Sequence, residues 1–273
     1  MKLWTGKQKR PKIGLALGSG GAHGLAHIGV IKTLLDNDIP IDCIAGTSAG
    51  ALIGGLYAAR KDIDAVERVA LASNLAQITN FVLDVSAHGG LLSGDAIEEF
   101  IRKELDDMTF ADLRLPLATV ATDIHTGKAV IMREGNVTAA IRASMSVPLI
   151  FKPVTYGSHL LVDGGLVMPV PVELARSMGA DIVIGVNLDT PCPHTQGAEN
   201  PSLAMIAEMT MEILRNNLGA TQAQTADVAI SPQFDGKVYV GWKDFLHAND
   251  MIARGQDAAE AALPQIKALL SNS

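Results

Sequence analysis

Short apolar runs alternate with amphipathic stretches along the chain, and this alternation predicts strands followed by helices. The predicted strands are residues 12–17, 41–45, 115–122, 128–133, 159–162, 181–188 and 228–230, with short extended runs at 147–151 and 154–156. The predicted helices are residues 25–35, 49–60, 62–77, 96–105, 137–144, 171–178, 203–224 and 250–270. Several strands are apolar at nearly every position, which is typical of parallel strands covered on both faces. The pattern therefore predicts an α/β fold of three α/β/α layers with a mainly parallel central sheet.

Three segments have a more specific predicted place. Residues 181–188 (DIVIGVNL) are the most strand-like run in the chain and are predicted to be central in the parallel sheet. Residues 115–122 and 128–133 flank a short turn and are predicted to pair as a hairpin. Residues 79–94 combine large apolar side chains with a Gly-Gly pair, and we expect this segment to cover a site.

The composition agrees with a layered fold of small aliphatic residues. The chain has 273 residues, of which 48% are hydrophobic and only 4% aromatic, and 26 are glycines. We expect a single domain over residues 1–273, with a core at about 13–189, a flexible loop at about 190–201 and a C-terminal helical part at 202–270. The formal net charge of -7 argues against nucleic acid as a partner.

The N-terminal sequence does not match a secretion signal or a membrane span. The apolar run after the basic stretch MKLWTGKQKRPK is short, broken by glycine and followed by His23 and His27. No uninterrupted apolar run approaches the ~20 residues that cross a bilayer. We therefore expect a cytoplasmic protein. Its basic end is expected to be solvated, with contact to an anionic membrane surface as the alternative.

Residues 46–50 (GTSAG) lie between a predicted strand and a predicted helix. A G-x-S-x-G sequence in that context is typical of a sharp turn that exposes a serine hydroxyl, here Ser48. The turn brings the flanking positions close together, and Gly46 and Gly50 lack the Cβ atoms that would collide. The N-terminus of the helix favours negative charge near Ser48. The alternative is a turn of small residues without chemistry.

Residues 18–24 (GSGGAHG) form a second glycine-rich connection between strand and helix, which is typical of an anion-binding loop. A phosphate-binding loop would end in Gly-Lys-Ser/Thr, and a dinucleotide fingerprint would have glycine where His23 stands. An oxyanion hole for Ser48 fits the sequence best. His23 and His27 have the i, i+4 spacing of metal ligands, but no third ligand is near in sequence, so we predict no metal site.

Asp163 follows a predicted apolar strand and precedes Gly164 and Gly165. The simpler interpretation is that these residues form a turn without a catalytic role. The alternative is a general base for Ser48, because the end of an apolar strand can present a carboxylate from the sheet. A solvated aspartate with a pKa of roughly 3.9 is a weak base, whereas burial would raise that pKa and a direct hydrogen bond would supply the geometry.

Together, residues 18–30 (GSGGAHGLAHIGV), 46–50 (GTSAG) and 163–165 (DGG) resemble the patatin-like phospholipase family, most of all its bacterial members related to neuropathy target esterase. The resemblance implies a patatin-like fold and a Ser–Asp dyad, with Ser48 as nucleophile and Asp163 as base. It implies an oxyanion hole made by backbone N–H groups around Gly20 and Gly21. The supporting motif positions are Gly18, Ser19, Gly24, Gly46, Gly50, Gly164 and Gly165.

The resemblance implies cleavage of fatty-acyl ester or phospholipid substrates through an acyl-enzyme, without metal or cofactor. Two positions depart from the family's usual Gly-Gly-Gly-x-Arg/Lys-Gly loop: Ser19 stands at the first glycine and His23 at the basic residue. A histidine there makes loop anchoring or head-group attraction weaker or pH-dependent.

The expected function is that of a serine acyl-ester hydrolase acting on lipids, of phospholipase, lysophospholipase or carboxylesterase type. Three alternatives remain: a Ser–His–Asp triad, an acyltransferase using the same acyl-enzyme, and a catalytically silent lipid-binding or regulatory protein on the same scaffold. The triad requires a histidine beside Ser48, and His159 is close to Asp163 in sequence. The candidates are His88, His125, His159, His194 and His247.

Overall fold

The structure is a computed structural model and describes residues 10–72, 92–189, 202–234 and 247–271. Its strands are β1 (Ile13–Leu17), β2 (Cys43–Thr47), β3 (Leu117–Asp123), β4 (Lys128–Met132), β5 (Val154–Tyr156), β6 (His159–Asp163), β7 (Ile182–Val186) and β8 (Val228–Ile230). Its helices are α1 (Ala26–Asp36), α2 (Ala49–Arg60), α3 (Ile63–Ala72), α5 (Asp95–Leu105), α6 (Val137–Ser144), α7 (Val172–Ser177), α8 (Leu203–Ala223) and α9 (Ala248–Ser271). Short 3-10 turns cover Gly21–Leu25, Phe110–Asp112 and Gly164–Leu166.

The described strands form one sheet of eight, in the order β5-β6-β3-β2-β1-β7-β8, and β4 pairs with β3 as the predicted hairpin. Strands β3, β2, β1, β7 and β8 are parallel, whereas β4, β5 and β6 are antiparallel to their neighbours. The prediction of a mainly parallel sheet is confirmed. The prediction that residues 181–188 are central is wrong, because β7 lies second from the β8 edge and β1 and β2 lie further in.

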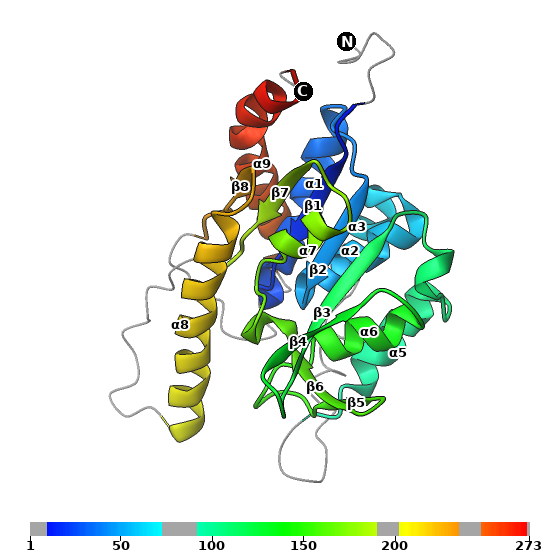
Figure 1. Ribbon diagram of the computed structural model, residues 1–273, viewed down its shortest axis with the longest axis vertical. Coiled ribbons are helices and arrows are strands. Elements are labelled where there is room, and N and C mark those ends of the chain that lie inside the picture. The colour runs from blue at the N-terminus through cyan, green and yellow to red at the C-terminus, as the bar shows by residue number, and fades with distance from the viewer. Residues whose placement is uncertain (1–9, 73–91, 190–201, 235–246, 272–273) are drawn as a thin grey trace.

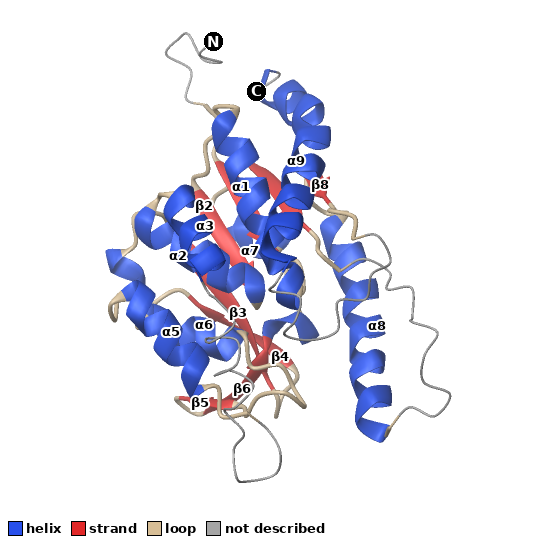
Figure 2. Ribbon diagram, turned by 180° about the vertical axis from the view of Figure 1, so that it is seen from behind, coloured by secondary structure: helices blue, strands red, loops and turns tan. Residues whose placement is uncertain are grey.

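The sheet is covered on both faces, as the three-layer prediction requires (Figure 1). Alternate residues of each strand enter different apolar clusters, because successive side chains point to opposite faces. In β1, Leu15 and Leu17 pack with α1, α2 and α9, whereas Ala16 packs with α7. Figure 2 shows α1, α2, α3 and α9 on the face opposite to α7. The α/β/α architecture is therefore confirmed.

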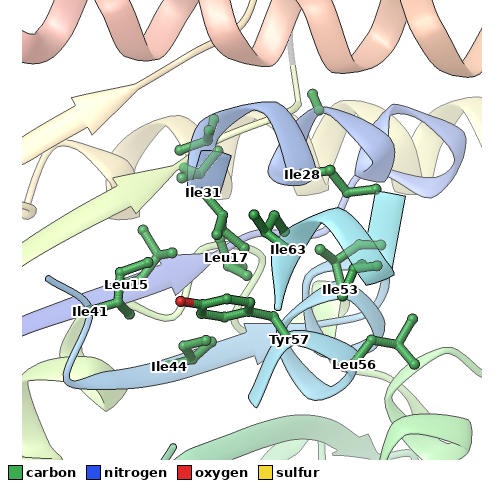
Figure 3. Packing of buried hydrophobic residues seen from close by; sticks show 14 of the residues in the cluster. Leu15, Leu17, Ile28, Ile31, Ile41, Ile44, Ile53, Leu56, Tyr57 and Ile63 are labelled. Carbon is green, nitrogen blue, oxygen red and sulfur yellow. The ribbon is translucent and has the colours of Figure 1, made fainter. Parts of the chain in front are cut away.

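The larger cluster is packed around Tyr57 of α2, which is 1% exposed (Figure 3). Its ring lies among Leu15 of β1, Ile44 of β2 and Ile63 of α3, so one side chain joins the sheet to two helices. This packing fixes α2 along β1 and β2, and because α2 directly follows β2, its first turn lies at the carboxyl end of that strand. The N-terminus of α2 is thereby placed at the edge of the sheet where parallel strands end, which is where α/β proteins bind ligands.

Helix α8 differs from the others because its N-terminal half extends beyond the sheet (Figures 1 and 2). Six of its large apolar side chains are exposed: Leu203, Met205, Ile206, Met209, Ile213 and Leu214. Its C-terminal half contacts the body, where Gln222 bonds the backbone of Val167 and Val170. In the part of the chain that the structure describes, no helix combines the length and apolar character that a membrane span requires.

One predicted element is wrong. Residues 147–151 form a turn rather than an extended run, since the N–H groups of Ile150 and Phe151 both donate to the carbonyl of Val147. Leu149 within it has a φ of 68°. The predicted cover at 79–94 lies outside the described residues up to position 91, as do the loop at 190–201 and the basic N-terminus. The single-domain organisation stays a prediction.

Candidate functional site

Ser48 lies in a sharp turn between β2 and α2. Its φ of 54° and ψ of -119° are unusual for a residue with a side chain, so the backbone is strained there. A Cβ at Gly46 would lie 2.6 Å from the carbonyl oxygen of Gly50, and one at Gly50 would overlap the carbonyl of Leu17. The two glycines flanking Ser48 are therefore required sterically, as the sequence pattern suggested.

Ser48 and Asp163 are brought together although they are 115 residues apart in sequence. The Ser48 hydroxyl donates to Asp163 Oδ2 at 2.6 Å, and both residues are 5% exposed. Strand β6 runs antiparallel to β3 and pairs Asp163 with Ala121. Ala121 follows Val120, and Val120 pairs with Thr47 of β2. The register therefore brings the carboxyl end of β6 level with Ser48.

The carboxylate of Asp163 is oriented from both sides. Its Oδ1 accepts the N–H of Gly165 at 2.7 Å, which leaves Oδ2 directed at Ser48. Burial raises the pKa of Asp163 from 3.8 to about 6, against the opposing hydrogen bonds from Ser48 and Gly165 and the positive charge of Arg215. A carboxylate with this pKa is ionised at neutral pH and is a stronger base than a solvated aspartate.

The residues that end α6 contact both members of this pair. The Ser144 hydroxyl accepts the backbone N–H of Ser48 at 2.8 Å and donates to the carbonyl of Val120 at 2.6 Å. The carbonyl of Ser146 accepts the N–H of Asp163 at 2.9 Å. One short segment thus fixes the backbone on both sides of the hydrogen bond. Sequence reasoning missed these two serines, because nothing in the pattern separates them from ordinary helix-end residues.

The glycine-rich loop lies against the same turn, since a Cβ at Gly24 would overlap the side chain of Ala49. The backbone of the loop is fixed at its start: Gly18 N–H donates to Val186 and Ser19 N–H to Pro169. Among the described residues, the N–H groups of Gly20 and Gly21 meet no acceptor. An oxyanion hole requires free backbone donors, and this loop supplies two of them in a segment that packs on the turn of Ser48.

The two histidines of this region, His23 in the loop and His27 in α1, have structural partners. His27 is fully buried and its Nε2 lies 2.8 Å from the carbonyl of Gly18, so the ring fixes the loop. The ring of His23 stacks on Phe234 with centroids 4.0 Å apart. Burial lowers both pKa values to about 4, helped at His23 by the charges of Arg215 and Arg254. Any pH dependence of loop anchoring or head-group attraction that arises from protonation of His23 is therefore expected below physiological pH.

His159, the candidate for a triad, bonds elsewhere: its Nδ1 lies 2.9 Å from Asp123 Oδ2. His88 and His194 lie outside the described residues. The hydroxyl of Ser48 is directed at Asp163, which favours a two-residue arrangement over a triad.

A buried ion pair adjoins the loop, and sequence reasoning missed it. The guanidinium of Arg215 in α8 contacts Asp189 Oδ1, and the hydroxyl of Ser19 donates to Asp189 Oδ2. Asp189 lies just beyond the carboxyl end of β7, a position that could have marked it as a candidate. No pattern in the sequence connects Arg215 to the site.

A family model described as patatin-like phospholipase matches residues 15–176. An uncharacterized NTE family protein of Mycobacterium tuberculosis is 39% identical over 181 residues, which cover 66% of this chain and 49% of that protein. Human patatin-like phospholipase domain-containing protein 6 is 35% identical over 181 residues, covering 64% of this chain and 13% of that protein. The chain spans about half the length of the mycobacterial relatives that it matches.

Among solved structures, VipD from Legionella pneumophila covers 94% of this chain and 67% of its own, with a TM-score of 0.49 and 12% identity.

Proposed function

Since the chain belongs to the patatin-like phospholipase family, as its match over residues 15–176 shows, we propose that it hydrolyses fatty-acyl ester bonds of lipids. The family supports a lipid hydrolase in general. The more specific proposal is a Ser–Asp dyad with Ser48 as nucleophile and Asp163 as general base. The observation that carries it is the 2.6 Å hydrogen bond from a strained serine to a buried carboxylate.

The proposed reaction proceeds through an acyl-enzyme. Asp163 Oδ2 accepts the hydroxyl proton of Ser48 as the serine oxygen attacks the ester carbonyl carbon. The N–H groups of Gly20 and Gly21 stabilise the resulting oxyanion. The ester C–O bond then breaks and Asp163 returns the proton to the departing alkoxide. A water molecule then attacks the carbonyl carbon of the acyl-enzyme while Asp163 accepts its proton. The bond to the Ser48 oxygen breaks, Asp163 returns the proton to that oxygen, and the fatty acid is released.

Two alternatives differ from this proposal in ways that an experiment separates. An acyltransferase would form the same acyl-enzyme and pass it to an acceptor other than water. A catalytically silent lipid-binding protein would not require the strain at Ser48, nor free N–H groups in the loop that packs on its turn. Both features favour an enzyme.

The test is intact-mass analysis after treatment with a fluorophosphonate, followed by assay with a lysophospholipid. We expect one adduct on the folded parent protein and release of free fatty acid without an added acceptor. An adduct with acyl transfer only to an added alcohol would support the acyltransferase. Absence of any adduct would favour the silent lipid-binding protein.

The raised pKa of Asp163 predicts the pH dependence of the reaction. Only the ionised carboxylate accepts the Ser48 proton, so kcat/KM should fall about tenfold per pH unit below pH 6 and level off above about pH 7. His23 and His27, with pKa values near 4, stay neutral over this range. A pH–rate profile with a neutral p-nitrophenyl ester measures the acidic limb. A midpoint above about pH 7 would contradict Asp163 as the base.

We also propose that the exposed side of α8 contacts a zwitterionic lipid surface. Leu203, Ile206, Met209 and Ile213 follow helical spacing and form one stripe, with exposed fractions from 37% to 84%. Residues 203–214 contain two glutamates and no lysine or arginine, so attraction to anionic lipid cannot drive the contact. Burial of apolar area in the interface remains as the driving force, at about 25 cal/mol per Å².

Vesicle co-sedimentation tests this contact. The triple substitution Ile206→Ser, Met209→Ser, Ile213→Ser should weaken binding to phosphatidylcholine vesicles at least about tenfold, with little dependence on salt. The control is Ile124→Ser with Ile131→Ser, two side chains of similar exposure on the β3–β4 hairpin. Equal binding by parent and triple variant would contradict the proposal. Loss of a dimer in light scattering would instead assign the stripe to a second copy.

A further inference from the structure

Arg215 is the one basic residue of α8, and its guanidinium pairs with Asp189, which lies just beyond the carboxyl end of β7. Its Nε and Nη2 each lie 3.0 Å from Asp189 Oδ1, and a second carboxylate, on Glu212, lies 4.0 Å from Nη2. The Asp189 side chain is 2% exposed, whereas that of Arg215 is 27% exposed. The carboxylate is therefore the buried member of the pair and depends on Arg215 for neutralisation.

The second oxygen of the same carboxylate contacts the glycine-rich loop. Ser19 is 2% exposed, and its hydroxyl donates to Asp189 Oδ2 at 3.1 Å. Asp189 is itself fixed, because its N–H donates to Asn187 Oδ1 at 3.1 Å. The carboxylate thus bridges Arg215 on one oxygen and Ser19 on the other, and Ser19 directly precedes the two glycines with free N–H groups.

A second contact joins the same groups at Gly165. A Cβ placed there would lie 3.1 Å from Arg215 Cδ, 3.2 Å from Ser19 Cβ and 2.9 Å from Asp163 Oδ1. The stem of Arg215 therefore packs at the point where the loop meets the dyad carboxylate. Its charge acts there as well: Arg215 lowers the pKa of Asp163, and Asp189 raises it.

We propose that Arg215 is a positioning residue, which through Asp189 fixes Ser19 and so sets the N–H groups of Gly20 and Gly21 for the oxyanion. This inference rests on the proposed ester hydrolysis. Because those donors act on charge that develops in the transition state, a misplaced loop lowers kcat more than it raises KM. Removing Arg215 leaves Asp189 buried without its counter-ion, and the carboxylate then takes up a proton or turns away from Ser19.

The pair offers a substitution that separates this role from simple destabilisation. Asp189→Asn keeps a side-chain oxygen that can accept from Ser19 but carries no charge, so it no longer requires Arg215. The double variant Arg215→Met, Asp189→Asn should therefore regain what Arg215→Met loses. Arg176→Met is the matched control, since Arg176 pairs with Asp227 in a partly exposed ion pair that lies outside the residues of the site.

The experiment measures kcat and KM with p-nitrophenyl butyrate, per active site counted by complete fluorophosphonate labelling. We expect Arg215→Met to lower kcat by about tenfold to a hundredfold with KM within about threefold, and the double variant to return to within about threefold of the parent. Arg176→Met should match the parent.

Two results overturn the proposal while leaving ester hydrolysis intact. One is a parent-like kcat per site in Arg215→Met, so that any loss lies in the number of folded sites. The other is a double variant no faster than the single one. A parent protein with neither labelling nor turnover overturns the proposed function and this inference with it.

Discussion

Replacing Ser48 with alanine is expected to abolish fluorophosphonate labelling and to lower ester turnover by at least about 10⁴-fold. Nucleophile removal has effects of this size in other serine hydrolases, where the residual rate comes from oxyanion stabilisation and binding alone. The substitution removes the hydroxyl that donates to the carboxylate of Asp163 and changes no backbone requirement of the turn, because Gly46 and Gly50 remain. Intact mass after labelling and initial rates with a lysophospholipid measure the two effects.

The control for this experiment is Ser158→Ala, which replaces an exposed serine in the turn between β5 and β6. It should label and turn over as the parent does. Alanine at position 48 removes a hydrogen bond to the buried Asp163 carboxylate, so a modestly lower melting temperature is expected. Substantial turnover by a folded Ser48→Ala protein would contradict the dyad and direct attention to another nucleophile.

Most of the fold could be predicted because its elements depend on local patterns. Strands β1 and β7 are apolar throughout and β2 and β3 are mostly apolar, and their alternation with amphipathic segments predicts a covered parallel sheet. The two wrong predictions concern features that tertiary structure determines. The order of strands is not encoded in the strength of any one strand, so DIVIGVNL is an inner strand without being a central one. At 147–151, two backbone bonds to Val147 override the extended preference that flanking prolines suggest.

The residues of the site also fall into two groups: those placed together by local sequence and those brought together by tertiary packing. Ser48, Gly46 and Gly50 belong to one turn, so their spacing carries the steric requirement in the sequence itself. The contact with Asp163 depends on the antiparallel register of β6, which local patterns do not determine. The pair formed by Asp189 and Arg215 joins a strand end to a distant helix, and only the packing of α8 brings them together.

Replacing Asp163 with asparagine is expected to lower kcat/KM by about 10³-fold or more and to slow labelling of Ser48 correspondingly. Asparagine preserves the shape and an acceptor for the N–H of Gly165, but it cannot take the proton from Ser48. Asp123→Asn is the matched control: Asp123 is also 5% exposed, lies at the end of β3, and bonds His159 instead of Ser48. Equal losses in both variants would indicate a general effect on the sheet, not removal of a base.

The same substitution should stabilise the protein at alkaline pH, which tests the burial of this charge independently of turnover. The pKa of Asp163 is about 6 when folded and 3.8 ordinarily, so its contribution to stability is complete below about pH 4 and is lost as the pH rises through 6. The difference corresponds to about 3 kcal/mol at most. Urea unfolding at about pH 5 and about pH 8 should show the advantage of Asp163→Asn growing by about 1–2 kcal/mol. If the difference in the free energy of unfolding between parent and variant were the same at both pH values, ionisation of Asp163 would not be costly in the folded protein. The strength of this carboxylate as a base would then need another explanation.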